Sequence, residues 1–142
     1  MTLPENFPSA LKAALEAKGY ASLTEVQSAV LAPEAEGRDL LVSAQTGSGK
    51  TVAFGLAMAP QLLAGADRLP PAGAPLAIVI APTRELALQV QRELAWLYAE
   101  AGARLASCVG GMDARAERRG FAEARRGSAP NLDGARHEQS PR

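Results

Sequence analysis

The sequence predicts an α/β fold in which a parallel sheet is flanked by helices. Short apolar runs at residues 39–44, 76–81 and 104–109 alternate with segments whose composition and spacing are helical. The run at 76–81 shows no polar alternation, as expected of a strand buried on both faces of a parallel sheet. Strands that alternate with helices in this way favour a doubly wound arrangement. A chain of 142 residues fits one such domain.

Two short helices are expected before the first strand. Residues 8–18 begin near a proline, carry Leu11 and Leu15 on one face and stop at Gly19. A second helix begins near Thr24, contains Gln27 and is interrupted by Pro33.

Three further helices are expected after the first strand. Residues 50–63 have helical composition, and a loop rich in proline and glycine follows at 64–75. Residues 83–100 place apolar side chains on one helical face, and an arginine-rich helix runs up to residue 126. From residue 127 the apolar periodicity is lost. We therefore expect a domain at 1–126 and a disordered tail at 127–142.

Composition excludes several classes of protein. Hydrophobic residues make up 47% of the chain, which rules out collagen-like and wholly disordered proteins. No stretch approaches the roughly 18 apolar residues of a membrane helix, and the first residues resemble no secretory signal, so no membrane partner is expected. Cys108 is the one cysteine and has no disulfide partner within the chain, which favours a cytoplasmic location. We expect its side chain to be a small buried hydrophobe.

A glycine-rich segment between the first strand and its helix has the pattern of a phosphate-binding loop. Gly47 and Gly49 let backbone N–H groups turn inward around phosphate oxygens, and the following helix start adds positive potential. Lys50 can reach the β- and γ-phosphates, and the Thr51 hydroxyl is suited to Mg²⁺. The alternative is a βα turn without a ligand. The expected ATP-binding segment is Ala44, Gln45, Thr46, Gly47, Ser48, Gly49, Lys50 and Thr51.

Hydrolysis of a nucleoside triphosphate needs a further acidic group at the end of another apolar strand. Every acidic residue after the loop lies in the proline-rich loop, on a predicted helix or in the tail. The chain therefore contains the elements of nucleotide binding, and we expect no catalytic residue in it.

Four ordered motifs between residues 19 and 111 resemble those of DEAD-box RNA helicases. Residues 19–27 are similar to the Q motif and residues 44–51 to motif I, which in that family also begins with alanine. Residues 82–87 match motif Ia, and Gly110 and Gly111 stand where the family has its GG element. The resemblance implies the N-terminal part of a RecA-like P-loop domain. The Asp-Glu-Ala-Asp box and the second RecA-like domain of the family have no counterpart in the sequence.

The resemblance also implies residue roles. Gln27 would read the adenine edge, since an amide offers a donor and an acceptor together, and Tyr20 would pack beside the base or serve as a core aromatic. Trp96 could stack on a base or pack on its helix face. The arginines beyond residue 114 form either a phosphate contact or a solvated face. Contacts to the RNA backbone would come from Pro82, Thr83, Arg84, Gly110 and Gly111.

Three functions are compatible with these motifs. The first is a fragment of an ATP-dependent RNA helicase that binds ATP and Mg²⁺ and contacts RNA, but neither hydrolyses ATP nor unwinds RNA. The second is a non-catalytic nucleotide- or RNA-binding module. The third, a small P-loop kinase, would need acceptor-binding and lid arginines after a second apolar strand, whereas this chain has the Q motif and motif Ia.

Overall fold

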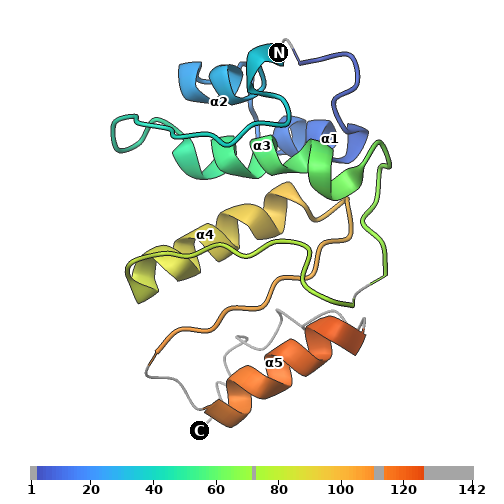
Figure 1. Cartoon of the computed structure of the whole chain (residues 1–142), viewed down its shortest axis with the longest axis vertical. Helices are drawn as coiled ribbons and strands as arrows, with labels where there is room; N and C mark the ends of the chain where they lie inside the picture. The colour runs from blue at the N-terminus through green and yellow to red at the C-terminus, as the bar shows by residue number, and fades with distance from the viewer. Residues whose placement is uncertain (1–2, 72, 111–113, 127–142) are drawn as a thin grey trace, which may run out of the picture.

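The computed structural model describes residues 3–71, 73–110 and 114–126 and arranges them as a stack of helices joined by irregular segments (Figure 1). All five predicted α-helices are confirmed, with ends that differ from the predictions by a few residues. The helical elements are α1 Ser9–Ala17, α2 Glu25–Val30, the 3₁₀ turn η1 Pro33–Ala35, α3 Lys50–Leu63, α4 Arg84–Leu97 and α5 Ala114–Arg126. The predicted tail at 127–142 and Gly111 lie outside the described residues.

The core is built mainly from residues of α1, α3 and α4. α3 packs against α2 on one side and α4 on the other, and α1 packs against α4. The side chains of Leu11, Leu15, Leu56 and Leu97 are fully buried. For Leu11, Leu15 and Leu97 this agrees with the apolar helical faces predicted from their spacing. Burial of each such leucine is worth about 1.5–3 kcal/mol, so this cluster is what holds α3 in place.

Gly55 and Tyr98 fix the contact between α3 and α4. The Tyr98 hydroxyl donates to the Gly55 carbonyl at 2.6 Å. A Cβ atom at Gly55 would lie 2.7 Å from Leu97 Cδ2 and 2.9 Å from Leu94 Cδ2, so any larger residue there would force these buried side chains to shift. Burial raises the pKa of the Tyr98 hydroxyl, because the apolar surroundings disfavour its phenolate.

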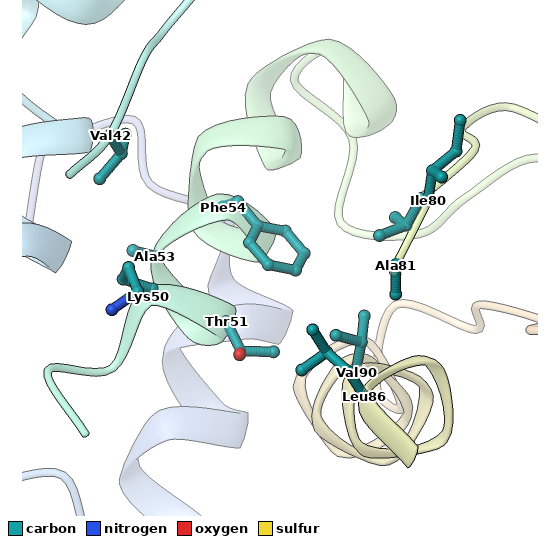
Figure 2. A pocket seen from close by; sticks show the side chains of 10 residues that line it. Val42, Lys50, Thr51, Ala53, Phe54, Ile80, Ala81, Leu86 and Val90 are labelled. Atoms are coloured by element: carbon teal, nitrogen blue, oxygen red, sulfur yellow. The ribbon is translucent and has the colours of Figure 1, made fainter. Parts of the chain in front are cut away.

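The predicted parallel sheet is not confirmed, because the segments predicted as strands at 39–44, 76–81 and 104–109 carry no strand among the described residues. All three segments run as irregular chain. A strand needs a neighbour about 4.8 Å away to pair its backbone groups. Val42 and Ile80, from the first two segments, lie on opposite sides of Phe54 (Figure 2), so these segments do not meet. The apolar composition of these segments is therefore not sufficient to form hydrogen-bonded strands.

The side chains of the first two segments remain largely exposed. Leu41 is 100% exposed, Ile80 91% and Ile78 81%. Ile78 and Ile80 belong to the segment whose lack of polar alternation predicted a buried strand, and the described residues leave both side chains exposed. The segments are apolar in composition, but the predicted burial of the strand at 76–81 is not found.

Cys108 also departs from its predicted place. It is exposed, and its Sγ lies 3.2 Å from Glu117 Oε2 of α5. Glu117 Oε1 accepts a hydrogen bond from the Val109 backbone N–H at 3.0 Å. The carboxylate of Glu117 thus holds the segment before α5. Cys108 lies exposed on this irregular segment and not in the strand interior where a buried cysteine was expected.

Candidate nucleotide-binding loop

The loop before α3 has the backbone of a phosphate-binding turn. Gly47 and Gly49 both have φ of 83°, in the left-handed region that favours glycine. Ser48 N–H donates to the Gln45 carbonyl at 3.2 Å and closes the turn. Gly49 is the N-terminal cap of α3 and has no side chain to satisfy the free N–H groups there. Those groups are available to an anion at the helix start.

Lys50 is bound by the loop itself. Its ammonium donates to the Ala44 carbonyl and, at 2.6 Å, to the Gln45 carbonyl. The ammonium has three donors, and two of them are occupied by these carbonyls. The loop therefore closes on its own lysine, and phosphate oxygens would have to replace the carbonyls as acceptors.

Gln27 is buried against the loop and joins α2 to α3. It is fully buried, and its Nε2 donates to the Gly49 carbonyl at 3.3 Å. Its Oε1 accepts from the Thr24 N–H at 3.1 Å, while the Thr24 hydroxyl accepts from the Gln27 N–H. These reciprocal bonds form a capping box at the start of α2. The structure brings Gln27 to the phosphate loop, where its amide contacts protein backbone.

The Ser48 hydroxyl oxygen and Thr51 provide the remaining polar groups. Ser48 Oγ is buried and has no hydrogen-bond partner among the described residues. A buried hydroxyl without a partner is unfavourable, so an acceptor or donor supplied by a ligand would satisfy it. Among the described residues no cluster of His, Cys, Asp or Glu could hold a metal ion by itself. Thr51 is the hydroxyl in the expected place for Mg²⁺ bound together with phosphate.

A cavity of about 280 Å³ lies between the starts of α3 and α4 (Figure 2). Its walls are mainly apolar, with Val42, Phe54, Ile80 and Val90 among them. Figure 2 shows the Lys50 ammonium directed away from this cavity. Thr51 lies on the opposite side of the helix start, toward Leu86 and Val90. The candidate phosphate site is therefore the loop itself, and the cavity belongs to the apolar surface between the helices.

The aromatic rings of Tyr20 and Trp96 lie close to each other. Their ring centroids are 6.0 Å apart, and the Lys18 ammonium lies 5.3 Å from the Trp96 centroid. Both rings pack against the core, and Trp96 Nε1 donates to Glu93 at 2.8 Å. The helix-packing interpretation of Trp96 is confirmed, and contact of Tyr20 with a base stays a prediction.

The start of α4 is the second candidate site. Pro82, Thr83 and Arg84 are exposed, and the Thr83 hydroxyl caps the helix by accepting from the Leu86 N–H at 3.2 Å. Gly110 is exposed at the end of segment 104–110. In Figure 1 the starts of α3 and α4 and the end of this segment all lie on the left side of the molecule. An exposed helix start beside an arginine is suited to phosphate oxygens.

The described helices include none that is long and apolar enough to cross a membrane. The predicted cytoplasmic location stays a prediction.

Sequence comparison finds extended similarity to RNA helicases. The chain is 49% identical over 89 residues to the chloroplastic DEAD-box ATP-dependent RNA helicase 3B of Zea mays, which covers 61% of this chain and 12% of that protein. It is 42% identical over 107 residues to the ATP-dependent RNA helicase RhlB of Xanthomonas campestris, covering 73% of this chain and 18% of RhlB. The chain therefore spans less than a fifth of the length of these two relatives.

A solved structure shares the fold. The crystal structure of the RNA helicase Prp28 from Chaetomium thermophilum bound to ADP superposes with a TM-score of 0.70 and 32% sequence identity. The match covers 88% of this chain and 30% of the Prp28 chain. The family model of the DEAD/DEAH box helicases matches residues 24–130. With the Q motif and the phosphate loop in contact through Gln27 and Gly49, this match assigns the chain to the DEAD/DEAH box helicase family.

Proposed function

We propose that the 142-residue chain binds ATP with Mg²⁺ at the loop of residues 44–51 and contacts the RNA sugar-phosphate backbone at the start of α4. The observation that carries the proposal is the loop itself. Two glycines in the left-handed region precede a helix start with free N–H groups, and Lys50 lies at that start. The names of the relatives, which are ATP-dependent RNA helicases, support the same ligands.

ATP binding requires a rearrangement at Lys50. In the closed loop its ammonium is bound to the Ala44 and Gln45 carbonyls. Phosphate oxygens are charged acceptors and form stronger hydrogen bonds with an ammonium than neutral carbonyls do. The exchange is therefore favourable once the triphosphate enters, and Ser48 Oγ and Thr51 Oγ1 would take the remaining oxygens and the metal. When bound, Mg²⁺ would neutralise part of the phosphate charge.

Gln27 would act in two ways. Its Nε2 holds Gly49, and one of its two N–H bonds suffices for that contact. Reading of the adenine edge needs the remaining donor and acceptor capacity, and it needs the fully buried amide to become accessible. We therefore expect ATP binding to move α2 relative to the loop.

We propose further that this chain does not hydrolyse ATP or unwind RNA. The sequence has no acidic residue that follows an apolar run after the phosphate loop, and it has no Asp-Glu-Ala-Asp box. A non-catalytic module that acts by occupying a partner would use the same residues, and it would likewise show no turnover of ATP.

Binding and turnover are tested together on the whole chain. A calorimetric titration with ATP and Mg²⁺ is expected to show saturable binding, and GTP is expected to bind more weakly if Gln27 reads the adenine. Phosphate release with and without oligouridylate is expected to remain at the level of the buffer. RNA-stimulated release would contradict the claim of a silent chain, and the absence of ATP binding would contradict the proposed site.

A further inference from the structure

α5 is attached through one face. Glu117, in its first turn, accepts from the Val109 N–H at 3.0 Å and contacts Cys108 Sγ at 3.2 Å. These contacts direct the Glu117 side of α5 toward segment 104–109. The opposite side of the helix is consequently directed away from that segment.

The arginine positions of α5 lie on that opposite side of the helix. Successive helical residues are separated by about 100°, which places all the arginine positions of α5 within an arc of about 120°. Glu117 lies about 140° from the centre of this arc, and Glu123 and Phe121 also fall outside it. Arg118 and Arg119 are exposed. The arginine face consists of positions 115, 118, 119, 125 and 126.

The arginine face continues the surface at the start of α4. In Figure 1 α5 begins on the side of the molecule where segment 104–110 ends and where α4 starts. Gly110 and Arg84 are both exposed there. A strand of RNA at the α4 start could therefore extend along α5.

We propose that the arginine face of α5 binds RNA phosphates and extends the contact made at the start of α4. The proposal rests on the proposed RNA binding and adds a surface to it. Guanidinium groups match phosphate oxygens in a two-point geometry, and a face of one sign favours a polyanion. A membrane fits less well, because a helix that lies in a bilayer surface needs a broad apolar face and Phe121 is the only large apolar residue of α5.

The test measures binding of the whole chain to fluorescein-labelled oligouridylate by anisotropy at several salt concentrations. The double variant Arg118→Gln/Arg119→Gln is expected to bind roughly tenfold more weakly, with a salt slope smaller by about 1.4, because each phosphate contact to single-stranded nucleic acid contributes about 0.7. Arg118→Lys/Arg119→Lys keeps both charges and is expected to keep most of the slope. Circular dichroism of each variant verifies that the helices are retained.

Charge-matched and site-matched variants separate the outcomes. Arg38→Gln/Arg92→Gln removes two exposed charges elsewhere and is expected to leave the slope nearly unchanged. Arg84→Gln tests the contact at the start of α4 alone.

If Arg84→Gln weakens RNA binding and the Arg118/Arg119 variant does not, the α5 proposal is overturned while the proposed function stands. If only the Arg118/Arg119 variant weakens binding, α5 is the RNA surface and the α4 contact fails. An Arg118/Arg119 variant that loses affinity for phosphatidylserine vesicles but not for RNA would assign the face to a membrane and overturn the proposal.

Discussion

The side-chain amide of Gln27 donates to the carbonyl of Gly49 at 3.3 Å, and this bond joins α2 to the turn that opens α3. The same carbonyl accepts the first helical hydrogen bond of α3, from the Ala53 N–H at 2.9 Å. A Cβ atom at Gly49 would lie 2.5 Å from Gln27 Nε2. The position of α2 and the shape of the loop are therefore coupled.

Gln27→Ala is expected to lower the free energy of unfolding by about 2 kcal/mol, because it removes a capping box and leaves buried backbone groups without partners. It is also expected to weaken ATP binding roughly fivefold, since a less ordered loop must be fixed on binding. Urea denaturation and ATP titration measure the two effects. Gln61→Ala, an exposed glutamine of α3, serves as the control and is expected to change neither.

Gly55→Ala tests the close approach of α3 and α4. Its Cβ would meet the ends of Leu94 and Leu97, and these side chains are buried and have little room to move. We expect a loss of about 1–3 kcal/mol in denaturant unfolding, despite the better helix propensity of alanine. Gly120→Ala in α5, where a Cβ meets nothing within 4 Å, should stabilise or leave stability unchanged. Equal effects at the two glycines would refute the packing described for Gly55.

Tyr98 makes stability depend on pH in the alkaline range. Because burial raises the pKa of its hydroxyl, the folded chain keeps a proton that the unfolded chain loses above about pH 10. In that range the folded state binds more protons than the unfolded state, so stability falls as the pH rises through it. Tyr98→Phe is expected to lower stability by about 1 kcal/mol at neutral pH and to flatten the alkaline slope. Thermal melts between pH 8 and 11 measure both, and an unchanged slope in Tyr98→Phe would contradict the assignment.

The contact of Cys108 with Glu117 reports on the attachment of α5. The hydrogen bond to Glu117, with the repulsion of its carboxylate, raises the pKa of the Cys108 thiol. The thiolate is the reactive form, so Glu117→Gln should move the pH profile of iodoacetamide alkylation to lower pH. Glu34→Gln, an exposed glutamate of η1, is the control. Identical profiles for the Glu117→Gln variant and the unmodified chain would show that α5 is not held in this way.

The helices were predictable from the sequence because their signals are local. Thr24 and Gln27 carry the capping-box pattern, and the spacing of Leu11 and Leu15 gave the buried face of α1. The phosphate loop was equally readable, since it is one contiguous motif. The same capping-box pattern could have indicated that the Gln27 amide turns inward, but its bond to Gly49 joins residues 22 positions apart and carries no sequence signal.

The sheet could not be predicted from apolar runs alone. An apolar run such as that around Ile78 and Ile80 indicates which side chains favour burial. A strand also needs neighbouring strands that form hydrogen bonds with its backbone. Among the described residues those neighbours are lacking, so both side chains are exposed. Cys108 was misplaced for the same reason, because its burial was deduced from a strand that did not form.

The central claim is that the loop of residues 44–51 binds ATP and that Lys50 contacts its phosphates. A single calorimetric experiment tests it directly, by titrating ATP and Mg²⁺ into the unmodified chain, Lys50→Ala and Lys12→Ala. Lys12 is an exposed lysine of α1, so Lys12→Ala removes the same charge as Lys50→Ala at a position outside the loop. We predict that Lys50→Ala binds at least about tenfold more weakly, because a charge-assisted hydrogen bond to phosphate is lost, and that Lys12→Ala binds as the unmodified chain does. Equal ATP affinity of Lys50→Ala and the unmodified chain would contradict the claim and place any nucleotide site elsewhere.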